Sequence, residues 1–316
     1  MKAKIGVALG AGAARGWAHI GILRALTQAG IVPDIIAGTS IGAVVGGCWA
    51  ASRLDELEGF ARDLTRRKVF GFLDFNLSGS GLITGQRVVE RLENHLRQEA
   101  IETLGSRFVA VATELGSGHE IWLSRGWLIE AMRASYAIPG IFKPVRLDGR
   151  WLFDGALVNP VPVSVCRALG ARYVIAVNLN ADLCGRGTVI ADPDPSVGFF
   201  PEEPPPPAIE ETTGRGARKL LQRQLFGGSE TGPGISTVMV DAFNIVQDRI
   251  ARSRLAGDPP DAMINPRLAG IGLFDFHRAD ELIQRGVAAA QREILDIRRE
   301  LDARRSMQRE RHAALS

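Results

Sequence analysis

The sequence is poor in cysteine and has no strong excess of charge of one sign. Its three cysteines, Cys48, Cys166 and Cys184, show no CxxC spacing and cannot form a disulfide framework, so a reducing, cytoplasmic compartment is the simpler interpretation. The 38 Lys and Arg residues stand against 35 Asp and Glu, which gives a net charge of only +3. A sequence-blind nucleic-acid binder usually carries a much larger basic excess, so we expect no nucleic-acid partner.

The chain also lacks a clear membrane anchor, signal peptide or metal-ligand cluster. The stretch Ile35–Ser52 is uncharged, but its four glycines favour a strand, a turn and a helix over a membrane span. Arg15 and His19 interrupt the N-terminal apolar run, which argues against a signal peptide. No group of His, Cys and Asp has ligand spacing, so neither a metal nor another cofactor is expected. Any membrane contact is then peripheral, at the inner face.

Strand and helix patterns alternate along the first half of the chain. With 46% hydrophobic residues the composition is that of a globular protein, and the alternation predicts an α/β fold, a three-layer α/β/α sandwich around a mostly parallel sheet. Strands are predicted at Lys4–Leu9, Ile35–Ala37, Phe108–Thr113, Ile121–Leu123, Trp151–Phe153, Tyr173–Asn178 and Ala262–Asn265. Helices are predicted at Gly16–Ala29, Ile41–Ala51, Leu54–Phe60, Arg87–Leu96, Trp127–Ser135, Pro162–Leu169 and Ile235–Arg252.

The pattern breaks between residues 181 and 236, which hold the proline run Pro204–Pro207 and many glycines. We therefore expect a core over residues 1–180, a loop or disordered insertion over 181–236 with a short basic helix at Ala217–Leu225, and residues 237–316 as the rest of the same domain.

A charged C-terminal helix is predicted to begin near Arg278, and it carries a narrow apolar seam. Docking of the seam on the chain's own surface and a homodimer through the seam both explain it. The segment Arg298–His312 has six Arg against three acids, which fits a solvated helix end or a weak attraction for anionic lipid headgroups. The seam consists of Ile283, Val287, Ala290, Ile294, Ile297 and Leu301.

The clearest chemical motif is Gly38-Thr39-Ser40-Ile41-Gly42, between a short apolar strand and a small-residue helix. G-x-S-x-G in this context predicts a nucleophile elbow, whose turn is so tight that Gly38 and Gly42 must lack side chains. Ser40 then projects from the end of the sheet, with its backbone N–H at a helix N-terminus that favours developing negative charge. The alternative is a helix that packs closely through its small residues.

A nucleophilic serine needs a base, and none of the five histidines has a suitable context. Of His19, His95, His119, His277 and His312, the best candidate is His277, whereas His19 reads as structural, filling a gap against the glycine loop.

A carboxylate is the alternative base. Asp154 follows a predicted strand directly, and because the ends of parallel strands share one edge of a sheet, we expect it beside Ser40. Burial would raise its pKa enough to accept the serine proton, although an Asp-Gly pair alone also fits a simple turn.

The loop from Gly10 to Gly16 lies between the first strand and the first helix. It resembles a dinucleotide-binding glycine loop, but Arg15 stands where that fingerprint has its third glycine, and no acidic residue follows the second strand. The alternative is an oxyanion hole built from converging backbone N–H groups.

Taken together, Leu9–Gly16, Gly38–Gly42 and Asp154-Gly155-Ala156 resemble the motifs of the patatin-like phospholipases. The segments Gly16–Gly21 and Ala134–Val145 are similar to the bacterial branch related to neuropathy target esterase. The resemblance implies a patatin-like fold and a serine esterase that hydrolyses phospholipids or lysophospholipids through a Ser–Asp dyad.

By position, the resemblance makes Ser40 the nucleophile and Asp154 the base. It gives the oxyanion N–H groups to Ala11, Gly12 and Ala13, with Gly10, Arg15 and Gly16 supporting that loop. A non-catalytic adaptor with the same fold, and a nucleotide-dependent enzyme that uses the glycine loop, remain as alternatives.

Overall fold

The computed structural model describes residues 4–65, 99–139, 141–182 and 235–313. The chain divides into two units, one formed by Met1–Leu183 with Gln247–Ser316 and the other by Cys184–Val246. Of the second unit the structure describes only Ile235–Val246, the first part of the helix α9 (Ile235–Gly257). The predicted helices at 87–96 and 217–225, and nearly all of the predicted insertion, lie outside the described residues.

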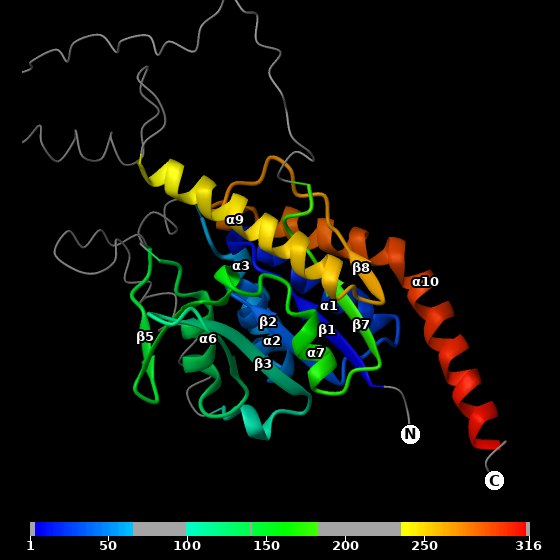
Figure 1. Ribbon diagram of the computed structural model, residues 1–316. Coiled ribbons are helices and arrows are strands. Elements are labelled where there is room, and N and C mark those ends of the chain that lie inside the picture. The colour runs from blue at the N-terminus through cyan, green and yellow to red at the C-terminus, as the bar shows by residue number, and fades with distance from the viewer. Residues whose placement is uncertain (1–3, 66–98, 140, 183–234, 314–316) are drawn as a thin grey trace, which may run out of the picture. The chain divides into compact units, whose positions relative to one another are not determined.

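The first unit is built around one mixed sheet with the strand order β5-β6-β3-β2-β1-β7-β8, and β4 pairs with β3 (Figure 1). The neighbours from β3 to β8 run parallel, whereas β4, β5 and β6 join by antiparallel pairing. The central strands are continuous apolar runs, as expected where both faces of a sheet are covered. The strands are β1 (Ile5–Leu9), β2 (Ile35–Thr39), β3 (Arg107–Glu114), β4 (Glu120–Leu123), β5 (Val145–Leu147), β6 (Arg150–Asp154), β7 (Tyr173–Val177) and β8 (Ala262–Ile264).

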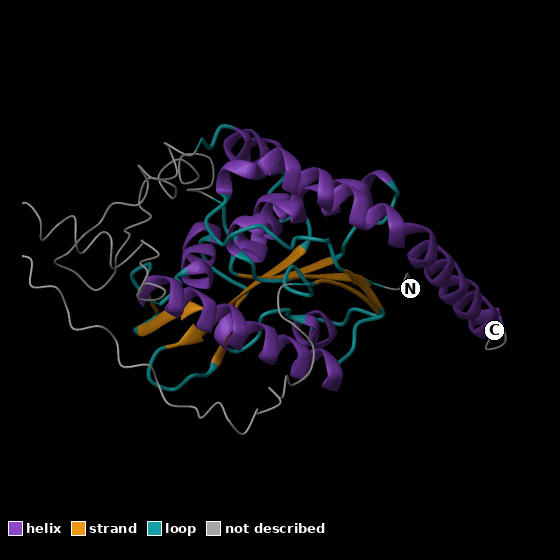
Figure 2. Ribbon diagram, turned by 90° about the horizontal axis from the view of Figure 1, so that it is seen from above, coloured by secondary structure: helices purple, strands orange, loops and turns teal. Residues whose placement is uncertain are grey.

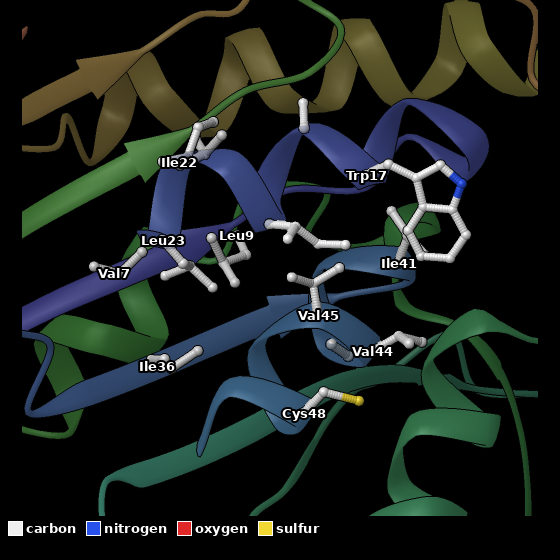
Figure 3. Packing of buried hydrophobic residues seen from close by; sticks show 14 of the residues in the cluster. Val7, Leu9, Trp17, Ile22, Leu23, Ile36, Ile41, Val44, Val45 and Cys48 are labelled. Carbon is white, nitrogen blue, oxygen red and sulfur yellow. The ribbon is translucent and has the colours of Figure 1, made fainter. Parts of the chain in front are cut away.

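Helices cover both faces of this sheet, as Figure 2 shows from above. The larger apolar cluster lies between the sheet and one group of helices: α1 (Trp17–Gln28), α2 (Ile41–Ala50), α3 (Leu54–Arg62), α6 (Leu128–Tyr136) and α10 (Ala279–Ala313). Part of this packing, including Leu9, Trp17 and Ile36, is visible in Figure 3. On the other face, a second cluster packs under α7 (Val163–Ala168) and the end of α9 around Ala251. The three-layer α/β/α prediction is therefore confirmed.

The uncharged stretch from Ile35 to Ser52 is divided between β2 and α2, as the glycines predict. The small residues of α2 let it lie close to the sheet, because a Cβ on Gly46 would be 2.7 Å from Cγ2 of Ile36. Among the helices in the described ranges, none combines the length and the apolar character that crossing a bilayer requires.

The C-terminal helix α10 packs against α1 through two glycines. A Cβ on Gly21 would collide with the carbonyl oxygen of Ile283, and one on Gly286 with that of Ala18. Four residues of the apolar seam are buried in the chain's own core cluster, and the other two, Val287 and Ile294, pack against it, so intramolecular docking is the interpretation that the structure supports. A homodimer stays an untested prediction.

Two arginines near the end of α10 also bind the chain itself. Nε of Arg298 donates to the carbonyl oxygen of Ala29 at 3.0 Å, and Arg304 pairs with Asp261 at 2.6 Å and lies over the ring of Tyr173. These two side chains therefore bind the chain itself, and the attraction of the segment for anionic lipid headgroups stays an untested prediction.

Candidate active site

Ser40 occupies a sharp turn between β2 and α2. Its backbone has φ 57° and ψ −125°, a left-handed conformation that a residue with a side chain rarely adopts. A Cβ on Gly38 would collide with the carbonyl of Gly42, and one on Gly42 would collide with the carbonyl of Leu9. The geometry is that of the predicted nucleophile elbow, in which both flanking glycines are required sterically.

The Ser40 side chain is paired with the carboxylate of Asp154. Oγ of Ser40 donates to Oδ2 of Asp154 at 2.6 Å, and both residues are buried. The other carboxylate oxygen accepts the N–H of Ala156 at 2.8 Å, which fixes the orientation of the carboxylate. Burial raises the pKa of Asp154 to about 7, although the hydrogen bonds from Ser40 and Ala156 act in the opposite direction. Such a carboxylate is a stronger base than an ordinary aspartate.

The strand that carries Asp154 runs opposite to the expected direction. We predicted a parallel strand whose end shares an edge with the elbow, but β6 is antiparallel to β3, so that argument was wrong. Instead, β2 and β6 lie along the same edge of β3 and run toward each other, so that their C-terminal ends meet. Thr39 is opposite Val111 and Asp154 is opposite the next residue, Ala112, while β4 pairs with both of these β3 residues from the other edge. The two strand ends therefore meet where Ser40 and Asp154 lie.

Ser135, on α6, contacts this junction and was given no role by the sequence. Its Oγ accepts the backbone N–H of Ser40 at 2.9 Å and donates to the carbonyl of Val111 at 2.6 Å. We had expected the Ser40 N–H to face developing negative charge, but in the structure it is already bound. The one available signal was the position of Ser135 within the segment Ala134–Val145 that resembles the family.

In the glycine loop, the backbone N–H groups have different partners. Gly10 donates to Val177 at 3.0 Å, and Ala11 donates to the carbonyl of Pro160 at 2.9 Å. Ala11 is thus not free to bind an oxyanion in this conformation, which corrects its predicted role. Within the described ranges, no hydrogen bond is found from the N–H of Gly12 or Ala13. Ala13 has φ 47°, a positive value that its side chain makes unfavourable.

The rest of the loop is held by close packing. A Cβ on Gly10 would be 2.7 Å from the Val177 carbonyl oxygen, and one on Gly16 would collide with the side chain of Ile41. Arg15 is buried beside them, with 2% of its surface exposed. The loop is therefore braced between β7 and the elbow helix.

His19 also supports the loop, as predicted. Its ring Nε2 lies 2.8 Å from the carbonyl oxygen of Gly10, to which the neutral imidazole donates. Complete burial lowers the pKa of His19 to about 4, so the ring is uncharged at neutral pH.

Among the described histidine side chains, neither His119 nor His277 accepts the Ser40 hydroxyl, which donates to Asp154. His119 is exposed, and its Nδ1 lies 3.7 Å from Oε2 of Glu114. His277 belongs to a 3-10 turn before α10. His95 lies outside the described residues, and His312 lies near the end of α10. Over the part of the chain that is described, no group of three or more His, Cys, Asp and Glu side chains is suited to hold a metal ion.

The family model and the relatives found by sequence agree on one group. The model of the patatin-like phospholipase family matches residues 7–167. An uncharacterized NTE family protein of Mycobacterium tuberculosis is 33% identical over 91% of this chain and 90% of its own length. Patatin-like phospholipase domain-containing protein 7 of Rattus norvegicus is 34% identical over 56% of this chain and 14% of its own length. Among solved structures, VipD from Legionella pneumophila aligns with 13% identity and a TM-score of 0.44, over 94% of this chain and 67% of that one.

Proposed function

This chain belongs to the patatin-like phospholipase family, and we propose that it is a serine esterase that hydrolyses acyl esters of phospholipids or lysophospholipids. The family membership confirms the resemblance carried by the three motifs. The observation that carries the proposed chemistry is the 2.6 Å hydrogen bond between the Ser40 hydroxyl and the buried Asp154 carboxylate. A cytoplasmic location and peripheral contact with membranes remain predictions.

In the proposed first step, Oγ of Ser40 attacks the ester carbonyl carbon while Oδ2 of Asp154 takes the hydroxyl proton. The tetrahedral oxyanion accepts hydrogen bonds from the N–H groups of Gly12 and Ala13, the two donors of the loop with no partner among the described residues. Collapse breaks the ester bond, and the leaving alcohol takes the proton from Asp154. The acyl group remains on Ser40.

The second step mirrors the first. Asp154 removes a proton from water, which attacks the acyl carbonyl and releases the fatty acid while Ser40 recovers its proton. A carboxylate with a pKa of about 7 suits both steps, because at neutral pH it is partly ionised yet basic enough to take a proton in the transition state.

The test compares wild type with Ser40→Ala on short-chain nitrophenyl esters and on mixed phospholipids and lysophospholipids, with products identified by mass spectrometry. Ser106→Ala is the matched control, since its hydroxyl bonds to the Pro33 carbonyl at the opposite end of the sheet. We expect the Ser40 variant alone to lose activity and fluorophosphonate labelling.

A non-catalytic adaptor predicts that a fluorophosphonate does not label Ser40 in folded wild-type protein. A nucleotide-dependent enzyme predicts heat of binding when NAD, NADP or ATP is titrated into the protein. Either result would contradict the esterase proposal.

A further inference from the structure

The backbone N–H of the nucleophile is held by a neighbouring side chain. Ser135 is fully buried, and its hydroxyl both accepts from Ser40 N–H at 2.9 Å and donates to the Val111 carbonyl at 2.6 Å. The Ser135 hydroxyl therefore donates its one hydrogen and accepts one hydrogen bond, both with backbone groups at the junction of β2, β3 and β6.

The position of this hydroxyl follows from the sheet register. Thr39 is opposite Val111 in the parallel ladder, and the N–H of Ser40 and the carbonyl of Val111 face each other just beyond this pair, because both bond to the Ser135 hydroxyl. The Ser135 hydroxyl stands between these two groups and bonds to each. It replaces one direct rung of the ladder by a bridge of two hydrogen bonds.

The bridge has a geometric consequence for Ser40. A direct rung would keep Ser40 in the strand, whereas the inserted hydroxyl leaves room for the chain to turn to φ 57° while its N–H stays bonded. The next position on β3 is then taken by Asp154, opposite Ala112. The same hydroxyl thus ends β2 and sets the distance from Ser40 to the incoming carboxylate.

We propose that Ser135 is a positioning residue for the esterase reaction: its hydroxyl fixes the Ser40 elbow against β3 and turns the Ser40 amide away from the acyl oxygen. The proposal rests on the proposed function. It also assigns oxyanion binding to the glycine loop, because the single hydrogen of the Ser40 amide is already donated to Ser135.

The test uses Ser135→Ala, with Ile129→Val as a matched control in the same helix. Ile129 is also buried but has no hydrogen bond to the elbow. Loss of the hydroxyl leaves the Ser40 N–H and the Val111 carbonyl either unpaired or joined directly, and both cases displace Oγ of Ser40. A misplacement of this kind costs on the order of 100-fold, so we expect kcat and the rate of fluorophosphonate inactivation to fall by about that factor while KM changes little.

Two further readouts separate positioning from a loss of folding. The hydrogen bond from Ser40 lowers the pKa of Asp154, so its loss should move the midpoint of the pH profile of kcat/KM upward in Ser135→Ala and leave it unmoved in Ile129→Val. Ser135→Thr retains the hydroxyl and should recover part of the rate that Ser135→Ala loses. The thiol of Ser135→Cys is a weak donor and acceptor, so the rate of this variant should lie between those of wild type and Ser135→Ala. It replaces the alanine variant in the test if that variant does not fold.

The proposal is overturned if Ser135→Ala or Ser135→Cys reacts as fast as Ile129→Val, or if the alanine variant changes KM and not kcat. Wild-type protein that no fluorophosphonate labels would overturn this proposal together with the esterase function.

Discussion

The raised pKa of Asp154 makes a prediction about rate. If Asp154 is the base, its ionised form is required, so kcat/KM on a soluble ester should rise with pH and level off above the pKa of about 7. Below that value the rate should fall about tenfold for each pH unit, because the ionised fraction falls by that factor. Replacement by asparagine keeps the shape but removes the base, and should lower kcat by roughly 100- to 10,000-fold at pH 8.

The burial of Asp154 also predicts that stability falls as the pH rises, whereas the rate increases. An ordinary aspartate has a pKa of ~3.9, so the folded protein holds a proton on Asp154 between about pH 4 and pH 7 that the unfolded chain has lost. This contribution to the free energy of unfolding is fully present below pH 4 and is lost as the pH rises to 7. It amounts to about 4 kcal/mol, taking 1.36 kcal/mol per pH unit. Asp154→Asn lacks this loss and should gain stability relative to wild type as the pH rises.

The assay measures initial rates and urea denaturation of wild type and Asp154→Asn from pH 5 to pH 9. Ser106→Ala is the control, because its hydroxyl is remote from the dyad. A wild-type kcat/KM that is flat between pH 5 and pH 8 would refute the reasoning. So would a stability difference between wild type and Asp154→Asn that does not change with pH.

Three other predictions follow from the packing around the site. Gly21→Ala should overpack α1 against α10 and lower the free energy of unfolding by about 1–3 kcal/mol or more. Gly59→Ala, whose Cβ would have open space in α3, should raise it by about 0.5–1 kcal/mol, and both changes are measured by urea denaturation. Gly42→Ala should abolish fluorophosphonate labelling, because the new Cβ collides with the Leu9 carbonyl under the elbow. His19→Gln should keep a donor for the Gly10 carbonyl and remove an acid-dependent loss of stability of about 3 kcal/mol between pH 6.5 and pH 4, measured by urea denaturation.

Much of the fold could be predicted from the sequence, because buried parallel strands are continuous apolar runs. β1, β2 and β7 lie within one or two residues of their predicted bounds. β5 was missed, since Val145–Leu147 is too short to show a period, and it is stabilised by pairing with β6. The mostly parallel sheet was predicted, but the direction of β6 was missed, because an isolated apolar segment looks the same in both directions.

The dyad residues could be named from the sequence because each follows a strand within a recognisable turn motif. Their contact depends on the register of β6 on β3, which no local pattern encodes. Ser135 was missed for the same reason: its partners, Ser40 and Val111, are distant in the chain and meet only through the fold. The N–H of Ala11 likewise has its partner in Pro160, far along the sequence.

Asp154 and His19 change the free energy of unfolding in opposite directions as the pH falls. As the pH falls from 7 to 4, Asp154 takes up a proton in the folded state and adds about 4 kcal/mol, while His19 stays neutral in the fold and its unfolded form gains a proton, which removes about 3 kcal/mol. These two contributions to the free energy of unfolding have opposite signs over this pH range. The single variants Asp154→Asn and His19→Gln should therefore show slopes of opposite sign relative to wild type.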